Sequence, residues 1–289
     1  MTASPDQLRA RAQAAVAGLP ALLLSAERLA ASLAPGAHGR RRAGPGEDFW
    51  QYRPVGQGDT ARSIDWRRSA RSDGQFVRDR EAQVAQSASI WVSAAAGMDF
   101  SAAPDRPTKR DRAALLALAL AIALLNGGER VALAGQPPRA GRIQADRMAE
   151  ALVARAALAE DEDAPPLQAL RPGQRALLLD DFLGDPAPVL AYLERAASLG
   201  VQGVLLQILD PEEESFPYAG AVLFRSGSGA LRHDTRDAAG LRAAYLARLA
   251  ARREVLGRAA LQAGWHFGTH DTGATPAQAA LWLWSALEG

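Results

Sequence analysis

Short apolar runs alternate with segments of helical spacing from residue 88 towards the end of the chain, and this alternation constrains the fold more than any other feature. The apolar runs are Ala88–Val92, Arg130–Ala134, Arg175–Leu179 and Gly203–Leu209. The segments of helical spacing between them are Lys109–Asn126, Gln144–Leu158 and Pro186–Leu199. Short, continuously apolar runs are typical of strands buried on both faces, and helices supply the crossovers that parallel strands need. We therefore expect an α/β fold, a mostly parallel sheet with helices on both faces.

Further elements are expected on either side of this pattern. Tyr218–Phe224 is predicted to be a strand, and Ala238–Ala263 and Thr275–Leu287 are predicted to be helices. Because Gly264, Gly268 and the polar stretch after them favour a loop, we expect His266 and His270 to be solvent-exposed loop residues.

The N-terminal segment also has helical spacing. Residues Pro5–Leu33 carry one apolar stripe, and Pro35-Gly36 ends the segment. The stripe consists of Leu22, Leu23, Ala26, Leu29 and Leu33. We therefore divide the chain into an N-terminal helical segment (1–36), an irregular arm (37–86) and the α/β domain (87–289).

Composition narrows the function classes. The chain has 289 residues, a net charge of +1 and no cysteine, which excludes disulfides, thiolate metal sites and thiol catalysis. The start, MTASPDQ, lacks the basic and apolar regions of a signal peptide. The longest strongly apolar run, Ala113–Leu125, is shorter than the ~20 residues of a membrane helix. We expect a soluble, cytoplasmic protein without direct membrane insertion.

The arm is unusually dense in Gly, Trp, Asp and Arg between Gly44 and Arg80. Over the slightly longer range from His38 to Gln86, ten arginines are interspersed with seven acidic residues. A surface that binds nucleic-acid phosphates would rarely carry so many carboxylates, so nucleic-acid binding is not expected.

Within the arm, Gly58-Asp59 is predicted to form a turn. Asp59 and Asp65 bracket Arg62, which favours an Arg–carboxylate network that fixes the arm. We interpret Ile64 and Trp66 as buried anchors rather than as base-stacking residues.

The arm resembles the signature of the bacterial domain-of-unknown-function 58 family. The matching motifs are Gly44-Pro45-Gly46-Glu47-Asp48-Phe49, Arg53-Pro54-Val55-Gly56-Gln57-Gly58-Asp59 and Arg62-Ser63-Ile64-Asp65-Trp66-Arg67-Arg68-Ser69-Ala70-Arg71. The resemblance implies a von Willebrand factor A-like, Rossmann-like domain after the signature, and a MoxR-type AAA+ ATPase as partner. The signature residues that it makes candidates for interaction are Gly46, Glu47, Phe49, Arg53, Gly58, Asp59, Arg62, Ile64, Asp65, Trp66 and Arg71.

Many domains of that fold bind a divalent cation through D-x-S-x-S after the first strand, the MIDAS motif, which supplies hard oxygen ligands. Here the matching residues are Ser93-Ala94-Ala95-Ala96-Gly97-Met98, so the resemblance implies a degenerate site at Ser93, Ala95 and Gly97. The remaining carboxylate, Asp181, is interpreted as a strand-end or helix-cap residue. We therefore predict no metal and no cofactor.

Three functions remain as hypotheses. We favour a non-catalytic protein-interaction module or scaffold that works with a MoxR-type ATPase. The alternatives are a metal-dependent ligand-binding domain and a hydrolase that uses Asp59, Asp65 and Asp181 as acids or bases. No Ser-His-Asp set and no phosphate-binding loop can be placed in support of an enzyme.

Overall fold

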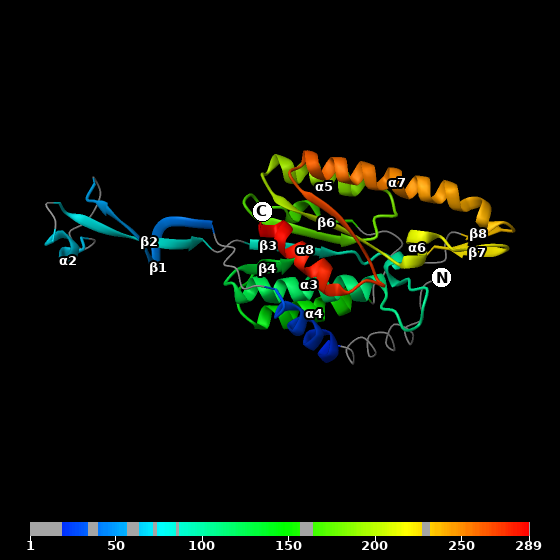
Figure 1. Cartoon of the computed structure of the whole chain (residues 1–289), viewed down its shortest axis with the longest axis horizontal. Coiled ribbons are helices and arrows are strands. Elements are labelled where there is room, and N and C mark those ends of the chain that lie inside the picture. The colour runs from blue at the N-terminus through cyan, green and yellow to red at the C-terminus, as the bar shows by residue number, and fades with distance from the viewer. Residues whose placement is uncertain are drawn as a thin grey trace. The chain divides into compact units, whose positions relative to one another are not determined.

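A computed structural model describes residues 19–33, 40–56, 64–71, 74–84, 87–156, 164–226 and 232–288. These residues form two compact units. One unit comprises residues 40–84, and the other comprises residues 19–33 together with 87–288 (Figure 1).

The larger unit is built on a five-stranded sheet in which every neighbouring pair of strands is parallel. The strand order is β4-β3-β5-β6-β9. The strands are β3 (Ser87–Val92), β4 (Arg130–Leu133), β5 (Arg175–Asp180), β6 (Gln202–Leu209) and β9 (His266–Asp271). The predicted α/β class, a Rossmann-like sandwich with a mostly parallel sheet, is confirmed.

Helices cover both faces of this sheet (Figure 1). On one face pack α3 (Lys109–Asn126), α4 (Ile143–Ala156), α8 (Pro276–Glu288) and the helical residues 19–30. On the other face pack α5 (Ala187–Ser198) and α7 (Ala238–Gln262). The short elements are the 3-10 turns η1 (Ala96–Asp99) and η2 (Leu167–Ala169), helix α6 (Pro211–Ser215) and the antiparallel pair β7 (Val222–Arg225) and β8 (Arg232–Thr235).

Side chains of each central strand alternate between the two cores. On β3, Ile90 and Val92 belong to the core under α3, whereas Trp91 belongs to the core under α5 and α7. Because both faces are covered, the strands need apolar residues at every position, and this is why they appear as unbroken apolar runs in the sequence. The N-terminal stripe also packs as predicted, since Ala26, Leu29 and Leu33 are buried in the α3 core.

The prediction of a loop at His266 and His270 is wrong. His266–Asp271 is strand β9, which pairs along β6 from Val204 to Leu209. Gly268 lies within this strand and does not mark a turn. A Cβ at this position would lie 2.4 Å from the Trp282 ring. The glycine is required for α8 to approach the edge strand. His270 is buried, whereas His266 is exposed.

Two other boundaries differ from the predictions. The strand expected from Tyr218 begins only at Val222. The arm is more regular than the predicted irregular segment, because β1 (Arg40–Pro54) and β2 (Phe76–Val84) form an antiparallel ribbon with register shifts after Ala43 and after Phe49. Cross-strand backbone pairing therefore organises this unit.

The smaller unit also contains the four-residue helix α2 (Trp66–Ser69). Asp65 caps this helix by accepting a hydrogen bond from the Arg68 amide at 3.0 Å. Ile64 is half-buried and bridges to the buried Val77. The prediction that Trp66 is buried is wrong, since 57% of this residue is exposed. Asp65 and Ile64 hold the start of α2 against β2, and the Trp66 ring is left on the outside of the turn.

Candidate functional site

The topology of the sheet creates a crevice at the carboxyl ends of β3 and β5. From β3 the chain runs through α3 to β4, which lies on one side of β3. From β5 it runs through α5, on the opposite face, to β6 on the other side. The loops after β3 and β5 therefore diverge, and such a switch point is where open parallel sheets bind ligands.

A cavity of about 470 Å³ lies at this place. Its lining comes from the loop after β3, from Lys109 on α3, and from residues 180–186 at the end of β5. Residues of α5, α6, α7 and β7 complete it. Its volume is within the range of small-molecule and side-chain pockets.

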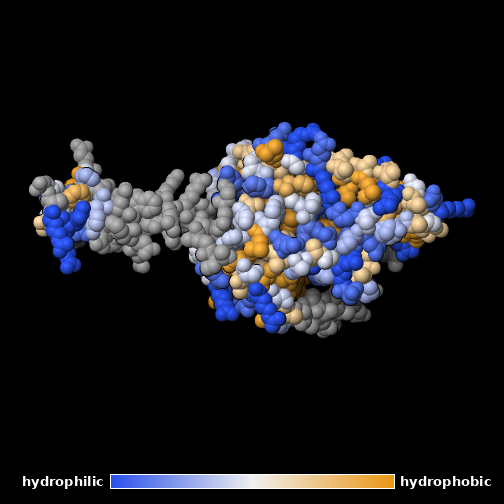
Figure 2. Space-filling view, viewed as in Figure 1, coloured by the Kyte–Doolittle hydropathy of each residue, from blue (hydrophilic) through white to orange (hydrophobic). Residues whose placement is uncertain are grey.

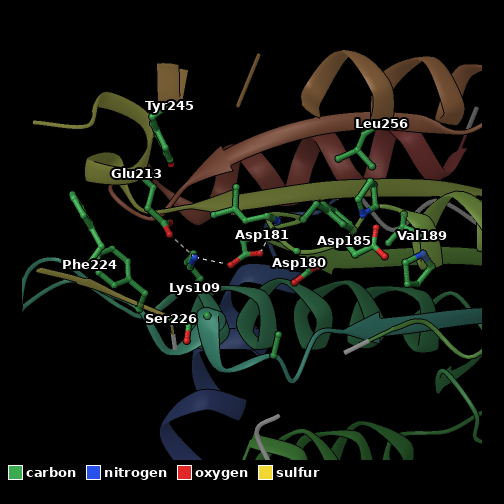
Figure 3. A pocket seen from close by; sticks show the side chains of 18 of the residues that line it. Lys109, Asp180, Asp181, Asp185, Val189, Glu213, Phe224, Ser226, Tyr245 and Leu256 are labelled. Carbon is green, nitrogen blue, oxygen red and sulfur yellow. Dashed lines mark hydrogen bonds and ion pairs between the residues drawn. The ribbon is translucent and has the colours of Figure 1, made fainter. Parts of the chain in front are cut away.

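Lys109 is the central charged residue of this site. Its Nζ lies 2.8 Å from Asp181 Oδ2 and 2.7 Å from Glu213 Oε1, and only 1% of the residue is exposed (Figure 3). Lys109 is the first residue of α3, and Thr108 with Asp111 forms a capping box that fixes this end of the helix. Burial alone would lower the pKa of Lys109, but the two carboxylates outweigh it and raise the pKa above the ordinary value. Lys109 is therefore a buried ammonium ion.

Asp181 is held at both its side chain and its backbone. Its Oδ1 accepts a hydrogen bond from the Leu183 amide at 3.0 Å, while its main-chain oxygen accepts one from Gln207 Nε2 at 2.8 Å. Gln207 Oε1 in turn accepts a hydrogen bond from Arg253 Nε of α7 at 2.7 Å. The structure thus places Asp181 directly after β5, with its second carboxylate oxygen on Lys109.

Glu213 reaches the site from α6. Asp210 caps this short helix, and Glu213 Oε2 accepts a hydrogen bond from the Asp210 amide at 2.9 Å. Burial raises the pKa of Glu213, and Lys109 opposes that effect without cancelling it. The capping box therefore orients Glu213 so that its other oxygen meets Lys109.

Asp180 is the least satisfied carboxylate of the site. It is 8% exposed and lines the cavity, and its Oδ1 has no hydrogen-bond partner among the residues that the structure describes. Burial, followed by the neighbouring charge of Asp181, raises the pKa of Asp180 to about 8, while a hydrogen bond with Ser93 opposes the rise. Asp180 is therefore mainly protonated at neutral pH.

The loop after β3 holds the positions matched to metal ligands, Ser93, Ala95 and Gly97. Ser93 Oγ accepts a hydrogen bond from the Ala95 amide at 3.2 Å. The Arg110 guanidinium donates to the main-chain oxygens of this loop and pairs with Asp99. A Cβ at Gly97 would lie 3.1 Å from Asp181 Oδ2, so a side chain here would face the oxygen that Lys109 now contacts. No cluster of three or more His, Asp or Glu suited to a metal occurs within the described ranges.

Aromatic rings form one wall of the cavity. The Phe216 ring contacts the rings of Tyr218, Phe224 and Tyr245, Tyr218 also contacts Phe224, and all four residues line the cavity. Phe216 ends α6 in a left-handed conformation (φ 47°), and this turn directs the chain towards β7. Phe100 lies beneath Lys109, with its ring centroid 5.7 Å from Nζ. The site thus combines a charged floor with an apolar wall.

The predicted site residues of the arm are not gathered into this site. Gly58, Asp59 and Arg62 lie outside the described residues, so their predicted network is not addressed. Gly46, Glu47, Phe49 and Arg53 lie on β1, and Arg71 is an exposed residue after α2. Asp65 belongs to the smaller unit, where its Oδ2 accepts a hydrogen bond from Tyr52 at 3.4 Å.

Sequence reasoning missed Lys109, Glu213 and the aromatic wall. One signal was present, since Lys109 is the only lysine among 33 basic residues. A compact ammonium fits between two carboxylates in a space that does not suit the planar arginine fork. Glu213, in contrast, lies in an acidic run that appears solvated in sequence, and only the fold brings it to Lys109.

The profile described as "Protein of unknown function DUF58" matches residues 51–255. The chain belongs to the DUF58 family. The match includes β2, the α/β unit from β3 to β8 and most of α7, but not β9 or α8, and it contains every charged residue of the Lys109 site.

Three curated relatives are uncharacterized proteins, Mb1516 of Mycobacterium bovis and MT1527 and Rv1480 of Mycobacterium tuberculosis. Each is 28% identical over 212 residues, which cover 68% of this DUF58 chain and 66% of the relative. The chain thus matches slightly less than two thirds of the length of these relatives.

Among solved structures, the conserved hypothetical protein BatB from Bacteroides thetaiotaomicron is similar, with a TM-score of 0.41 and 14% identity. An aerotolerance-related membrane protein from Bacteroides fragilis has a TM-score of 0.40 and 16% identity. Both similarities cover 70% of this chain and 98% of the other. In the described part of this chain, no helix has the length and apolarity needed to cross a membrane.

Proposed function

We propose that this DUF58 protein is a cytoplasmic, non-catalytic protein-interaction module. The observation that carries the proposal is the pair of contacts between the buried Lys109 ammonium and the carboxylates of Asp181 and Glu213. The Lys109 ammonium lies beside the strand-end carboxylate of Asp181. Asp181 and Glu213 each use one carboxylate oxygen to bind this ammonium. Such a site stabilises a platform, and the cavity beside it offers a surface for binding.

The surface of the larger unit agrees with a localised binding site. On the face visible in Figure 2, hydrophobic residues occur in small groups among hydrophilic ones. An extended apolar face would indicate a large obligate interface. The cavity at the strand ends is the feature that favours a specific, localised contact.

The proposed partner is a MoxR-type AAA+ ATPase. This part of the proposal rests on the signature motifs between Gly44 and Arg71 and on the chain's place in the DUF58 family. Since no bridging metal is invoked, the contact relies on shape and on charge pairs. Such pairs weaken with salt, because exposed charges are screened within about 8–10 Å at physiological ionic strength.

A pull-down with the purified ATPase tests the proposal. We expect retention that survives EDTA, declines across a salt series and is accompanied by no hydrolytic activity of this protein. Asp65→Asn keeps the cap on α2 but removes the charge, and it should weaken retention. Asp237→Asn makes the same change at the cap of α7, where Asp237 accepts from the Gly240 amide at 3.1 Å, and serves as the control. Absence of binding in every nucleotide state would reject the partner, and a requirement for magnesium on this protein would reject the mechanism.

One observation favours a hydrolase as the alternative. Burial and the neighbouring charge of Asp181 raise the pKa of Asp180 to about 8, and a cavity carboxyl group with a raised pKa can act as a general acid or base. Of the acids proposed from sequence, Asp59 lies outside the described residues and Asp65 belongs to the other unit. Turnover of p-nitrophenyl phosphate or acetate by the wild type, abolished in Asp180→Asn, would establish the enzyme and overturn the non-catalytic proposal.

A further inference from the structure

The strand-end cavity carries an excess of negative charge. Even without the protonated Asp180, its lining carboxylates outnumber its cations, with Asp181, Asp185 and Glu213 against Lys109 and Arg225. The Lys109 ammonium is buried and already contacts two of these carboxylates. An acidic ligand would find no accessible cation at the floor, whereas a cationic ligand would meet the remaining negative charge.

A buried acceptor without a partner gives an independent indication of a ligand. Asp180 lines the cavity and is more than nine-tenths buried, and its Oδ1 lacks a hydrogen-bond partner within the described chain (Figure 3). A buried polar atom in this state costs about 1–3 kcal/mol. A ligand that brings an N–H donor into the cavity would remove that cost.

The aromatic wall suits a cation as well. Burial, and then the negative charges of Glu212 and Glu213, raise the pKa of Tyr218 to about 12. Burial, and then Glu213 and Glu214, also raise the pKa of Tyr245. Both phenols therefore lie in a negative field. Aromatic faces in such a field attract cations, and guanidinium groups more often than ammonium groups.

We propose that this cavity binds an arginine side chain presented by a partner polypeptide. A guanidinium is planar and can stack on an aromatic ring of the wall, and its several N–H groups suit an unpartnered acceptor such as Asp180 Oδ1. The inference rests on the proposed function as an interaction module, and it names the chemistry that the module recognises.

The probe is Nα-acetyl-arginine amide, titrated into the uniformly ¹⁵N-labelled full chain and followed by NMR. We expect saturable shifts at the amides of residues 180–185 and 213–226. Nα-acetyl-citrulline amide has nearly the same shape without the charge and should bind about tenfold more weakly or less. Nα-acetyl-aspartate amide should give no saturable shift at these residues.

Two variants test the charge and the ring separately. Asp185→Asn keeps the acceptor that bonds the Ala187 amide at 3.0 Å and removes the charge, and it should weaken arginine-amide binding about threefold. Phe224→Leu removes the ring and should also weaken binding about threefold. Glu194→Gln, an exposed position on α5 outside the cavity, is the matched control and should bind like the wild type.

The outcomes separate this inference from the proposed function. Equal binding of the arginine and citrulline probes, or shifts that do not map to the cavity, would overturn the arginine site. If the ATPase binds the wild type but the arginine probe does not bind, the interaction module stands and the arginine site falls. If the arginine probe binds as described but the ATPase does not, the site stands and the proposed partner is wrong.

Discussion

The Nζ atom of Lys109 lies 2.8 Å from Oδ2 of Asp181, although these residues are 72 positions apart in the chain. The same nitrogen contacts Glu213, so one ammonium joins the start of α3, the end of β5 and helix α6. A buried charge is tolerated only when it is paired, and here each partner is itself held by backbone hydrogen bonds. This ion cluster is therefore a structural element of the strand-end site.

Replacement of Lys109 should be strongly destabilising. Lys109→Met leaves the buried carboxylates of Asp181 and Glu213 without their cation, and we expect a loss of about 3–5 kcal/mol in the free energy of unfolding. Urea unfolding at neutral pH measures this change. In the triple variant Lys109→Met, Asp181→Asn, Glu213→Gln the cluster is replaced by neutral groups, and most of the stability should return. A loss below about 1 kcal/mol in the single variant would contradict a buried ion cluster.

Asp180 should make stability fall as pH rises. Its pKa is raised from 3.8 to about 8, so between these values the folded state keeps a proton that the unfolded state releases. The contribution of Asp180 to stability is thus present at low pH and is lost as pH rises towards about 8, with a slope of at most about 1.4 kcal/mol per pH unit. Asp180→Asn removes this dependence.

The measurement is the difference in unfolding free energy between wild type and Asp180→Asn at several pH values within that window. We expect the unfolding free energy of Asp180→Asn to increase relative to that of the wild type as pH increases. Asp185→Asn, at an acid of the same cavity with an exposed side chain, is the control. A difference that does not vary with pH would show that Asp180 is ionised in the folded protein.

Local patterns were sufficient for most of the sheet and helices. The Lys109–Asn126 helix has the predicted bounds, because Thr108 and the Gly127-Gly128 pair mark both ends in the sequence. The central strands were predictable because burial on both faces imposes an unbroken apolar run. Strand β9 was not, since it lies at the edge of the sheet and carries His, Gly and Thr, and only its pairing with β6 makes it a strand.

The position of Asp181 at a strand end could be predicted from the sequence, but the side chains that surround it could not. Asp181 could be assigned to a strand end from the apolar run before it. Its pairing with Lys109 and the approach of Glu213 to the same ammonium depend on contacts over 72 and 104 positions, which no local pattern contains. Trp66 was misassigned for a related reason, because tertiary packing decides whether a large aromatic residue is an anchor or an exposed contact.

His270 should have the opposite pH effect to Asp180. Its Nε2 lies 2.6 Å from Arg112 Nη1, so this ring nitrogen accepts and carries no proton. Burial, and then the charge of Arg112, lower the pKa of His270 from 6.5 to about 4. The unfolded state binds this proton at a higher pH than the folded state does. The contribution of His270 to stability is therefore lost as pH falls from 6.5 to about 4, by at most about 1.4 kcal/mol per pH unit. His270→Gln should flatten this slope, whereas His233→Gln, at an exposed position on β8, should not.

Magnesium and manganese should not stabilise this protein. The Lys109 ammonium already contacts Asp181, and positions 95 and 97 offer no side-chain oxygen. A ligand present at a hundred times its dissociation constant would add about 2.7 kcal/mol, which thermal melting detects readily. We expect the same melting temperature with either cation and with EDTA. A saturable, EDTA-reversible increase that disappears in Asp181→Asn but persists in Asp146→Asn, a distant exposed carboxylate, would reject this expectation.

Trp66 should contribute to binding rather than to stability. With 57% of the residue exposed, Trp66→Ala should change the stability of the smaller unit by no more than about 0.5 kcal/mol. Val77, which is buried in the same unit, is the matched comparison, and Val77→Ala should cost about 2 kcal/mol. Hydrogen exchange at the amides of β1 and β2 reports these changes locally, because it measures the opening of the ribbon itself.

The same Trp66→Ala variant should lose affinity for the ATPase in the pull-down. Exposed tryptophans at the centre of an interface commonly contribute 2 kcal/mol or more, which corresponds to roughly thirtyfold in the dissociation constant. We therefore expect unchanged hydrogen exchange together with weak retention. Accelerated exchange equal to that of Val77→Ala would make Trp66 a structural residue, and unchanged exchange with full retention would exclude it from the interface. Only the combination of an intact ribbon and lost binding assigns Trp66 to partner recognition.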